Sequence, residues 1–409
     1  MKDLDTKIAR RIIDTVGANG IPPEYGFQFF SEGLAPYLSV IEEEYLSTFI
    51  KQGGSAFKMV IGVYGGGKTH FLYSIRDLAW KQNFVVSYVS LSPGESPFHR
   101  LELVYRAIVR GILPPLTPDE LLSGYEQGIV SFIRSWFSMK YRELSSKGFS
   151  GEDLHNELLI HVENIHDIES ISMAKAIKSA FNALLNKQED DFLYICQWLT
   201  GEIYERRIHG KFGILQRIDR TTAFSMLRSL VHWVRQIGYT GLVILLDEAE
   251  RVPSLSTKQR EQHLNNLREV IDECGHTSFR NVMIFYAVPD ENFLEGRTQI
   301  YEALRQRVLT VFDMLNPTGV KLELEKLSIE PIPFLVQVGE KLKQIYEKAY
   351  DHHFEKEASK KTISTVAKAA YEQRYGDIGY KRLFVQKLVS GFHFLKRNGY
   401  PPSPDNLQM

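Results

Sequence analysis

Short, almost uninterrupted apolar runs are the most regular pattern in the chain, and they predict the strands of a buried sheet. Five runs of this kind occur, at 57–63, 84–91, 241–247, 282–288 and 308–312. Stretches with apolar residues at helical spacing separate them. Strands without a polar face are typical of parallel sheets that helices cover on both sides. We therefore predict an α/β fold with five largely parallel strands, the last closing the sheet near residue 313.

The interval between the second and third runs, residues 92–240, carries helical patterns and no convincing strand. Residues 117–120 (TPDE) have the pattern of a capping-box helix start. Apolar residues recur at helical spacing over 173–185 and 223–237. We therefore predict a long all-helical insertion at about 100–220.

These patterns divide the chain into three parts. Residues 1–55 form an N-terminal helical segment around the turn-rich stretch GANGIPPEYG. Residues 56–315 form the sheet domain with its insertion. Residues 316–409 return to helical spacing and are expected to form a helical lid domain.

Composition changes this picture little but limits the function. The chain has 409 residues, with 49 Lys and Arg against 50 Asp and Glu and a net charge of −1. A near-neutral chain lacks the simplest signal of nucleic-acid binding, although one basic face remains compatible with it. Two distant cysteines, Cys196 and Cys274, form neither a disulfide framework nor a metal-ligand cluster. No apolar run is long enough for a membrane helix, and charges interrupt the first residues, so we expect a cytoplasmic protein without a membrane partner.

The strongest chemical signal is the segment 62–69, GVYGGGKT, called the glycine-rich loop below. It matches G-x-x-x-x-G-K-[ST] and stands between an apolar run and a helical stretch, which disfavours a chance glycine-rich turn. Its backbone N–H groups and the helix N-terminus would surround phosphate oxygens. Lys68 would reach the β- and γ-phosphates of ATP, and the Thr69 hydroxyl would bind Mg²⁺. The predicted nucleotide-binding residues of this region are Gly62, Tyr64, Gly65, Gly66, Gly67, Lys68, Thr69 and His70.

A second signal is the apolar run that ends in Asp247 and Glu248. A carboxylate at a strand end beside a phosphate loop can hold Mg²⁺, which is the role predicted for Asp247 together with Thr69. Glu248 would accept a proton from the water that attacks the γ-phosphate. The pattern by itself is weak because acidic residues often end strands, and the glycine-rich loop is what gives it meaning.

The end of the run 282–288 departs from what an ATPase of this organisation usually carries. Such enzymes place a polar residue there, against the attacking water, whereas this run ends in Ala-Val-Pro at 287–289. Asp290 or Asn292 could serve, but a turn is the preferred interpretation of the segment.

Three arginines are candidates for contact with the transferred phosphoryl group. Arg305 and Arg307 precede the last predicted strand, where ring-forming ATPases often carry an arginine that reaches a neighbouring subunit's γ-phosphate. Arg382, near the start of a C-terminal helix, could fold back over the nucleotide. A purely structural role stays open for each of them, because arginines are common on helix surfaces.

A basic cluster in the insertion could meet a DNA backbone. Its acidic neighbours make a solvated helical face the preferred interpretation. The members of the cluster are Arg206, Arg207, His209, Lys211, Arg217 and Arg220.

Three segments, GIPPEYG, YGGGKTHFL and GYTGLVILLDEAER, carry a more specific likeness. They resemble the ATP-binding protein family of bacterial BREX phage-defence systems, over nearly the whole chain. The resemblance implies an AAA+ module similar to those of origin-recognition ATPases, with strand order 5-1-4-3-2 and a helical lid. It implies that Ile21 and Pro22 line the adenine pocket. It also implies defence against foreign DNA, often beside a helicase or methyltransferase.

The first functional hypothesis is an AAA+-type ATPase that binds ATP and Mg²⁺ and couples turnover to the remodelling or loading of a DNA-acting partner. The partner would be a helicase or another defence component, while direct DNA contact and homo-oligomer formation stay open. The second is a nucleotide-gated binding or assembly platform with negligible turnover, which the doubtful polar residue after 282–288 favours. The third, a small-molecule kinase, would need neither the insertion nor the lid.

Overall fold

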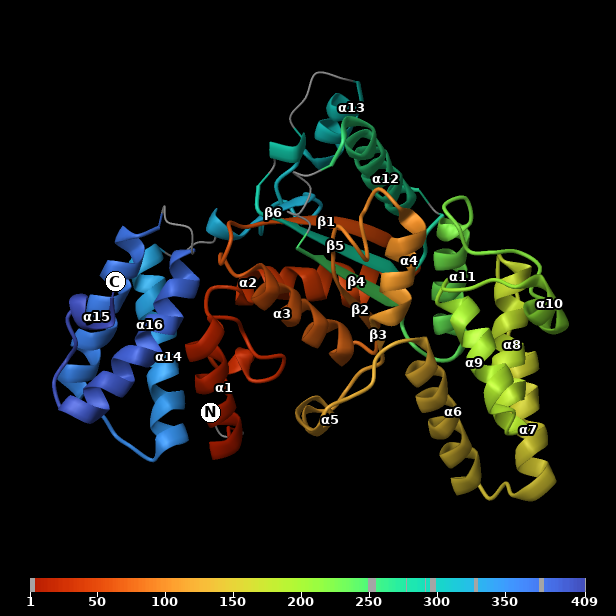
Figure 1. The fold of residues 1–409 in the computed structure, drawn as a ribbon, viewed down its shortest axis with the longest axis horizontal. Coiled ribbons are helices and arrows are strands. Elements are labelled where there is room, and N and C mark those ends of the chain that lie inside the picture. The colour runs from red at the N-terminus through yellow and green to blue at the C-terminus, as the bar shows by residue number, and fades with distance from the viewer. Residues whose placement is uncertain are drawn as a thin grey trace.

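The computed structural model describes residues 4–248, 255–276, 278–290, 292–294, 299–326, 330–374 and 379–408. Within these residues six strands form one sheet in the order β3-β2-β4-β5-β1-β6 (Figure 1). Their bounds are β1 (Ser55–Ile61), β2 (Val85–Ser90), β3 (Ile112–Leu113), β4 (Leu242–Asp247), β5 (Val282–Val288) and β6 (Lys321–Glu323). Neighbouring strands are parallel except β2 and β3, which pair antiparallel. The predicted α/β class is confirmed.

The predicted five strands in the order 5-1-4-3-2 differ from this sheet. The run 308–312 is not a strand, because Val308 ends a helix and Val311 forms only an isolated bridge to Lys321. The edge strand is instead β6, a Lys-Leu-Glu segment that pairs with residues 59–61. At the other edge, β3 adds a two-residue antiparallel strand beside β2. Without β3, the five parallel strands stand in the order β6-β1-β5-β4-β2. Such short segments carry no recognisable hydrophobic pattern, and only pairing along the sheet makes them strands.

Helices cover both faces of the sheet (Figure 1). One face packs against α2 (Ala35–Ile41), its π-helical continuation η2 (Glu42–Phe49) and α3 (Lys68–Lys81). The other packs against α4 (Leu101–Arg110), α11 (Ala223–Gln236), α12 (Thr257–Gly275) and α13 (Gln299–Val308). Along β4, Val243 and Leu245 belong to the first core, and Ile244 and Leu246 to the second. Burial on both faces explains why the central strands read as continuous apolar runs.

Residues 129–209 of the predicted insertion form helices beside the sheet, on the side opposite the C-terminal helices in Figure 1, whereas the short helix at 118–123 contacts the N-terminal helix, where Arg11 Nη1 donates to Leu122 O at 3.2 Å. The helices are α5 (Pro118–Ser123), α6 (Ile129–Ser146), α7 (Gly151–Glu163), α8 (Ile171–Leu185), α9 (Glu189–Leu199) and α10 (Arg206–His209). The capping box at Thr117 and Glu120 is present. Strand β3 also lies in this interval, so the prediction of an all-helical insertion is wrong at that point.

A helical body, defined here as α1 with α14, α15 and α16, lies at the other end of the molecule (Figure 1). Its bounds are α1 (Thr6–Asn19), α14 (Pro331–Tyr350), α15 (Lys356–Glu372) and α16 (Tyr380–Asn398). Ile12 and Val16 of α1 belong to the same buried core as Phe384 of α16. The guanidinium of Arg10 lies 4.3 Å from the ring centre of Tyr350. The N-terminal helix is therefore packed with the C-terminal helices.

Short 3₁₀ helices complete the described elements: η1 (Phe27–Phe29), η3 (Gly210–Phe212), η4 (Asn292–Leu294), η5 (Leu324–Lys326) and η6 (Asp405–Leu407). No helix in the described part of the chain is both long and apolar enough to cross a membrane. The sheet and the helical body meet at the glycine-rich loop, and the cleft described next lies at this junction.

Candidate nucleotide site

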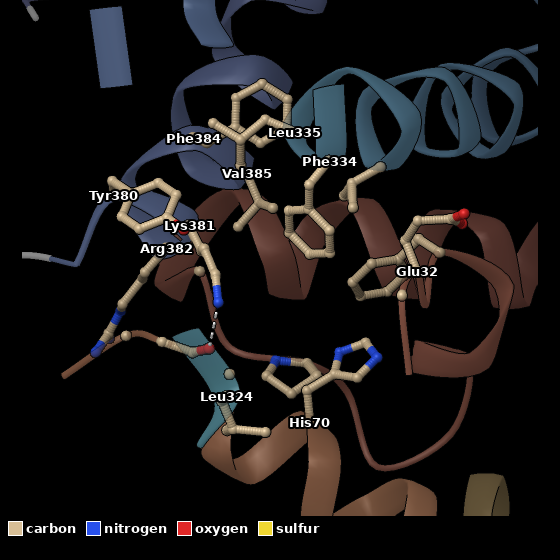
Figure 2. A pocket seen from close by; sticks show the side chains of 18 of the residues that line it. Glu32, His70, Leu324, Phe334, Leu335, Tyr380, Lys381, Arg382, Phe384 and Val385 are labelled. Carbon is tan, nitrogen blue, oxygen red and sulfur yellow. Dashed lines mark hydrogen bonds between the residues drawn. The ribbon is translucent and has the colours of Figure 1, made fainter. Parts of the chain in front are cut away.

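A cleft lies where the glycine-rich loop faces the helical body. It encloses about 1030 Å³ of space, part of it open to solvent. Figure 2 shows His70 and Leu324 on the sheet side, with Phe334, Lys381 and Val385 approaching from the helical body. The remaining walls include the segment after α1 and the loop itself, with Gly20, Ile21, Pro22, Gly65, Gly66 and Gly67.

The glycine-rich loop turns sharply into α3. Gly65 and Gly67 adopt positive φ angles of 71° and 102°, which glycine tolerates without strain. The buried ammonium group of Lys68 donates a hydrogen bond to Gly62 O at 2.9 Å. Loop glycines thus border the cleft directly before a helix N-terminus, which is an arrangement that binds anions.

Thr69 and Asp247, far apart in the sequence, meet at the start of α3. Thr69 Oγ1 donates to Asp247 Oδ2 at 2.8 Å, and Tyr88 OH donates to the same oxygen at 2.6 Å. The backbone N–H of Glu248 donates to Asp247 Oδ1 at 2.8 Å. Burial raises the pKa of Tyr88, so its phenol stays protonated and remains a donor. Three donors therefore orient the Asp247 carboxylate beside the Thr69 hydroxyl.

Glu248 is held in a less common backbone conformation, with a φ of 58°. Ser90 Oγ donates to its Oε2, and Ser90 is the residue of β2 that stands opposite Asp247 in the parallel register. Glu248 lines a second, smaller cavity of about 310 Å³ with Phe98 and His99, and is not among the residues that line the main cleft. Ser90 therefore holds the carboxylate at the edge of this second cavity.

Two cations at the start of α16 contact the glycine-rich loop in different ways. Lys381 Nζ donates to Gly66 O at 3.1 Å and to Glu325 Oε1 at 3.3 Å. Arg382 donates to Tyr64 OH at 2.8 Å and to the carbonyl group that ends α1, also at 2.8 Å. Figure 2 shows the two side chains diverging, with Lys381 extended into the cleft. The cation that lies over Gly66 is thus Lys381, beside the predicted Arg382.

The other part of the cleft is mainly apolar. The predicted adenine-pocket residues Ile21 and Pro22 line it, together with Phe334 of α14 and Val385 of α16. His70 also lines it, and burial lowers the pKa of His70 to about 4, so its ring is neutral at pH 7. Apolar walls with a few polar groups suit a flat heterocyclic ring.

A family model described as BREX system ATP-binding protein BrxC/D matches residues 4–403, nearly the whole chain. The chain belongs to this family. No curated protein and no solved structure gives a match. Family membership confirms the resemblance seen in the sequence, and the family's description indicates ATP as the nucleotide that its members bind.

In this member of the BREX family, Arg305 and Arg307 have different surroundings. Arg307 forms a two-pronged ion pair with Asp272 of α12, with Nε–Oδ1 and Nη2–Oδ2 distances of 2.5 and 3.0 Å. It also donates to Ala303 O at 2.9 Å. Arg305 is exposed and has no ion pair within the described ranges. Of the two, Arg305 is the one whose guanidinium can meet another molecule without breaking an internal pair.

After β5, Pro289 lies in a bend and Asn292 begins η4, while residue 291 of the predicted turn lies outside the described residues. Asp290 Oδ1 accepts a hydrogen bond from Asn292 N at 2.7 Å. Ala287 and Val288 are buried in the sheet. The strand therefore ends without a polar side chain.

The sequence prediction was wrong to include His209 in the basic cluster of the insertion. His209 is only 1% exposed, and its ring nitrogens contact Glu205 N at 2.9 Å and Tyr194 O at 3.2 Å. The remaining members are exposed: Arg206, Arg207, Lys211, Arg217 and Arg220. Their exposure agrees with the interpretation as a solvated face.

Several residues of the site were not predicted, among them Tyr88, Ser90, Glu325 and Lys381 with polar contacts and Phe334 and Val385 in the apolar wall. Tyr88 and Ser90 carried a usable signal, because they are the polar positions near the end of β2 and the sheet order places β2 beside β4. Glu325 and Lys381 are 56 positions apart and meet only because the helical body packs on the glycine-rich loop. No local pattern indicates that contact.

The donor set of Thr69 and Asp247 fits Mg²⁺. Hydroxyl and carboxylate oxygens are ligands that Mg²⁺ prefers, and this ion usually keeps several waters and shares its coordination with phosphates. The described residues contain no group of three or more His, Cys, Asp or Glu side chains that could hold a metal ion by themselves. Thr69 and Asp247 would therefore supply two ligands of Mg²⁺, and phosphate and water oxygens would complete its coordination.

Proposed function

We propose that the protein is an AAA+-type ATPase that binds ATP with Mg²⁺ in the cleft and hydrolyses it. Turnover would drive the remodelling or loading of a DNA-acting partner, such as a helicase, within a BREX defence system. The observation that carries the proposal is the contact of Thr69 with Asp247 at 2.8 Å beside the glycine-rich loop. An anion-binding loop, a hydroxyl group and an oriented carboxylate are the parts that phosphoryl transfer requires.

In this proposal the glycine-rich loop, the pair of Thr69 and Asp247, and the apolar part of the cleft each bind one part of the nucleotide. The loop N–H groups and Lys68 hold the β- and γ-phosphates, and Lys68 exchanges its hydrogen bond to Gly62 O for phosphate oxygens. Thr69 and Asp247 hold Mg²⁺, which when bound neutralises part of the phosphate charge. The residues that enclose the base are Ile21, Pro22, Phe334 and Val385.

The remaining roles concern hydrolysis itself. Glu248 accepts the proton of the attacking water, and the Ser90 hydroxyl fixes its carboxylate in the present conformation. Arg305 of a second copy supplies positive charge to the γ-phosphate across a subunit contact. Lys381 and Arg382 connect the helical body to the glycine-rich loop, so that nucleotide binding at the loop changes the contacts of the helical body as well.

The test is Glu248→Gln, which keeps the side-chain shape and removes the proton acceptor. ATP affinity should stay within about twofold of wild type, while phosphate release falls by about 100-fold or more. Affinity is measured with a fluorescent ATP analogue, and steady-state phosphate release with and without duplex DNA. A matched Glu261→Gln change on the exposed surface of α12 should alter neither quantity. Normal hydrolysis by Glu248→Gln would show that the assigned base is wrong.

A second candidate function is a nucleotide-gated assembly platform with negligible turnover. Two observations favour it: β5 ends without a polar side chain, and Ser90 holds Glu248 at the second cavity. Tight ATP binding without phosphate release, even with duplex DNA present, would support the platform. Turnover stimulated by DNA would support the ATPase.

A further inference from the structure

A carboxylate stands directly against the glycine-rich loop. Glu325 follows β6, and its Oε1 lies 2.7 Å from the position that a β-carbon on Gly66 would occupy. The same β-carbon would lie 2.8 Å from Val63 O, so the backbone also favours glycine at this position. The Glu325 side chain is 34% exposed, so the carboxylate belongs to the wall of the cleft and is only partly hydrated.

Two residues of the helical body contact this carboxylate. Lys381 Nζ lies 3.3 Å from Glu325 Oε1, and Tyr380 OH donates to Glu325 Oε2 at 3.4 Å. Lys381 Nζ also donates a hydrogen bond to Gly66 O, and the Lys381 side chain is 18% exposed. Burial lowers the pKa of Lys381, and the Glu325 carboxylate opposes that shift by favouring the charged form of the lysine.

A negative charge at this position opposes the ligand that the loop binds. Phosphates held by the loop N–H groups would lie next to the Glu325 carboxylate, and like charges repel more strongly where water is partly excluded. The repulsion depends on the net charge of the phosphate chain. Mg²⁺ cancels two negative charges, so the magnesium complex of ATP is repelled much less than the free tetra-anion.

We propose that Glu325 is a charge-selecting residue, which makes the cleft prefer the magnesium complex of a nucleoside triphosphate over the free nucleotide. This inference rests on the proposed binding of ATP in the cleft and adds a specificity determinant to it. Glu325 acts through its charge beside Gly66, while Lys381 limits the repulsion so that the magnesium complex still binds.

The test compares Glu325→Gln with wild type in the full chain, using ATP with Mg²⁺, ATP with EDTA, and adenosine. Glu325→Gln should bind free ATP about tenfold more tightly and the magnesium complex only about two- to threefold more tightly. Adenosine carries no phosphate, so its affinity should not change. Isothermal titration calorimetry measures all three dissociation constants.

Two further variants separate charge selection from a structural role. Glu323→Gln makes the same change two residues away, at a carboxylate that pairs with Lys326 and does not line the cleft, and should leave the three constants unchanged. Lys381→Met removes the counter-charge and should weaken free ATP more than the magnesium complex.

Equal effects of Glu325→Gln on all three ligands, or no effect on the ratio of free to magnesium-bound ATP affinity, would overturn charge selection alone. A wild-type protein that binds neither form of ATP would overturn the proposed ATP site and this inference with it. The two failures are therefore distinguishable in one experiment.

Discussion

The orientation of the Asp247 carboxylate rests on hydroxyl groups from two different elements. Thr69 lies at the start of α3 and Tyr88 lies on β2, and both donate to Asp247 Oδ2. The Tyr88 ring also packs at 5.4 Å, centre to centre, against Tyr73 of α3. A carboxylate held in this way is oriented before any ligand arrives, and such preorganisation lowers the cost of binding a metal in the right geometry.

Tyr88→Phe should therefore weaken magnesium binding with little effect on the nucleotide itself. The change removes one donor and keeps the ring, at a stability cost of about 1 kcal/mol. The Mg²⁺ concentration that gives half-maximal turnover should rise about fivefold, because an outer ligand typically contributes tenfold or more to a metal site and Thr69 remains. ATP affinity in EDTA should not change. An unaltered Mg²⁺ dependence would contradict this role of Tyr88.

The contact between α16 and the glycine-rich loop depends on a glycine. Gly379 precedes α16, and a β-carbon there would lie 1.9 Å from Tyr64 O. Its φ and ψ of −55° and 135° are open to any residue, so close approach alone selects glycine. This contact positions Lys381 and Arg382 over the loop.

Gly379→Ala should separate α16 from the loop while leaving the helical body folded. We expect ATP affinity to fall about tenfold, equivalent to about 1.4 kcal/mol, with little change in the melting temperature. Gly210→Ala is the matched control, because a β-carbon at Gly210 meets no atom within 4 Å. Unchanged ATP affinity in Gly379→Ala would show that the start of α16 does not shape the site.

Across the whole molecule, the helical body and the insertion helices α6 to α10 lie on opposite sides of the sheet (Figure 1). The cleft is formed by the sheet and the helical body, whereas the basic residues around α10 lie in the insertion. Arg305 lies on α13 and is not among the residues that line the cleft of its own chain. The proposal therefore assigns its contribution to hydrolysis to a second copy of the chain.

Arg305→Ala should abolish turnover without loss of ATP binding, and mixing it with Glu248→Gln should restore part of the activity. In mixed assemblies some contacts join an intact Glu248 to an intact Arg305 from the neighbouring copy. Arg307→Ala is the control for stability, since it removes the ion pair to Asp272 and should cost at most about 1 kcal/mol. Phosphate release from the mixture decides the question, and no recovery would contradict action between copies.

Local patterns were sufficient for the parts of the site that depend on neighbouring residues. The loop 62–69 was recognisable because turn glycines, lysine and threonine follow a buried strand and begin a helix. Asp247 was recognisable because an apolar strand ends there. The central strands were visible because burial on both faces removes polar residues from them.

The sequence by itself thus determined the buried strands, the glycine-rich loop and the acidic strand end, since each follows from residues adjacent in the chain. Tertiary structure alone decided the edge strands β3 and β6, the packing of α1 with the C-terminal helices, and the contact of Glu325 and Lys381 with Gly66. The physical reason is that these features depend on contacts between distant segments. Short strands gain their hydrogen bonds from a partner strand, and Lys381 reaches Gly66 only because the helical body packs on the glycine-rich loop.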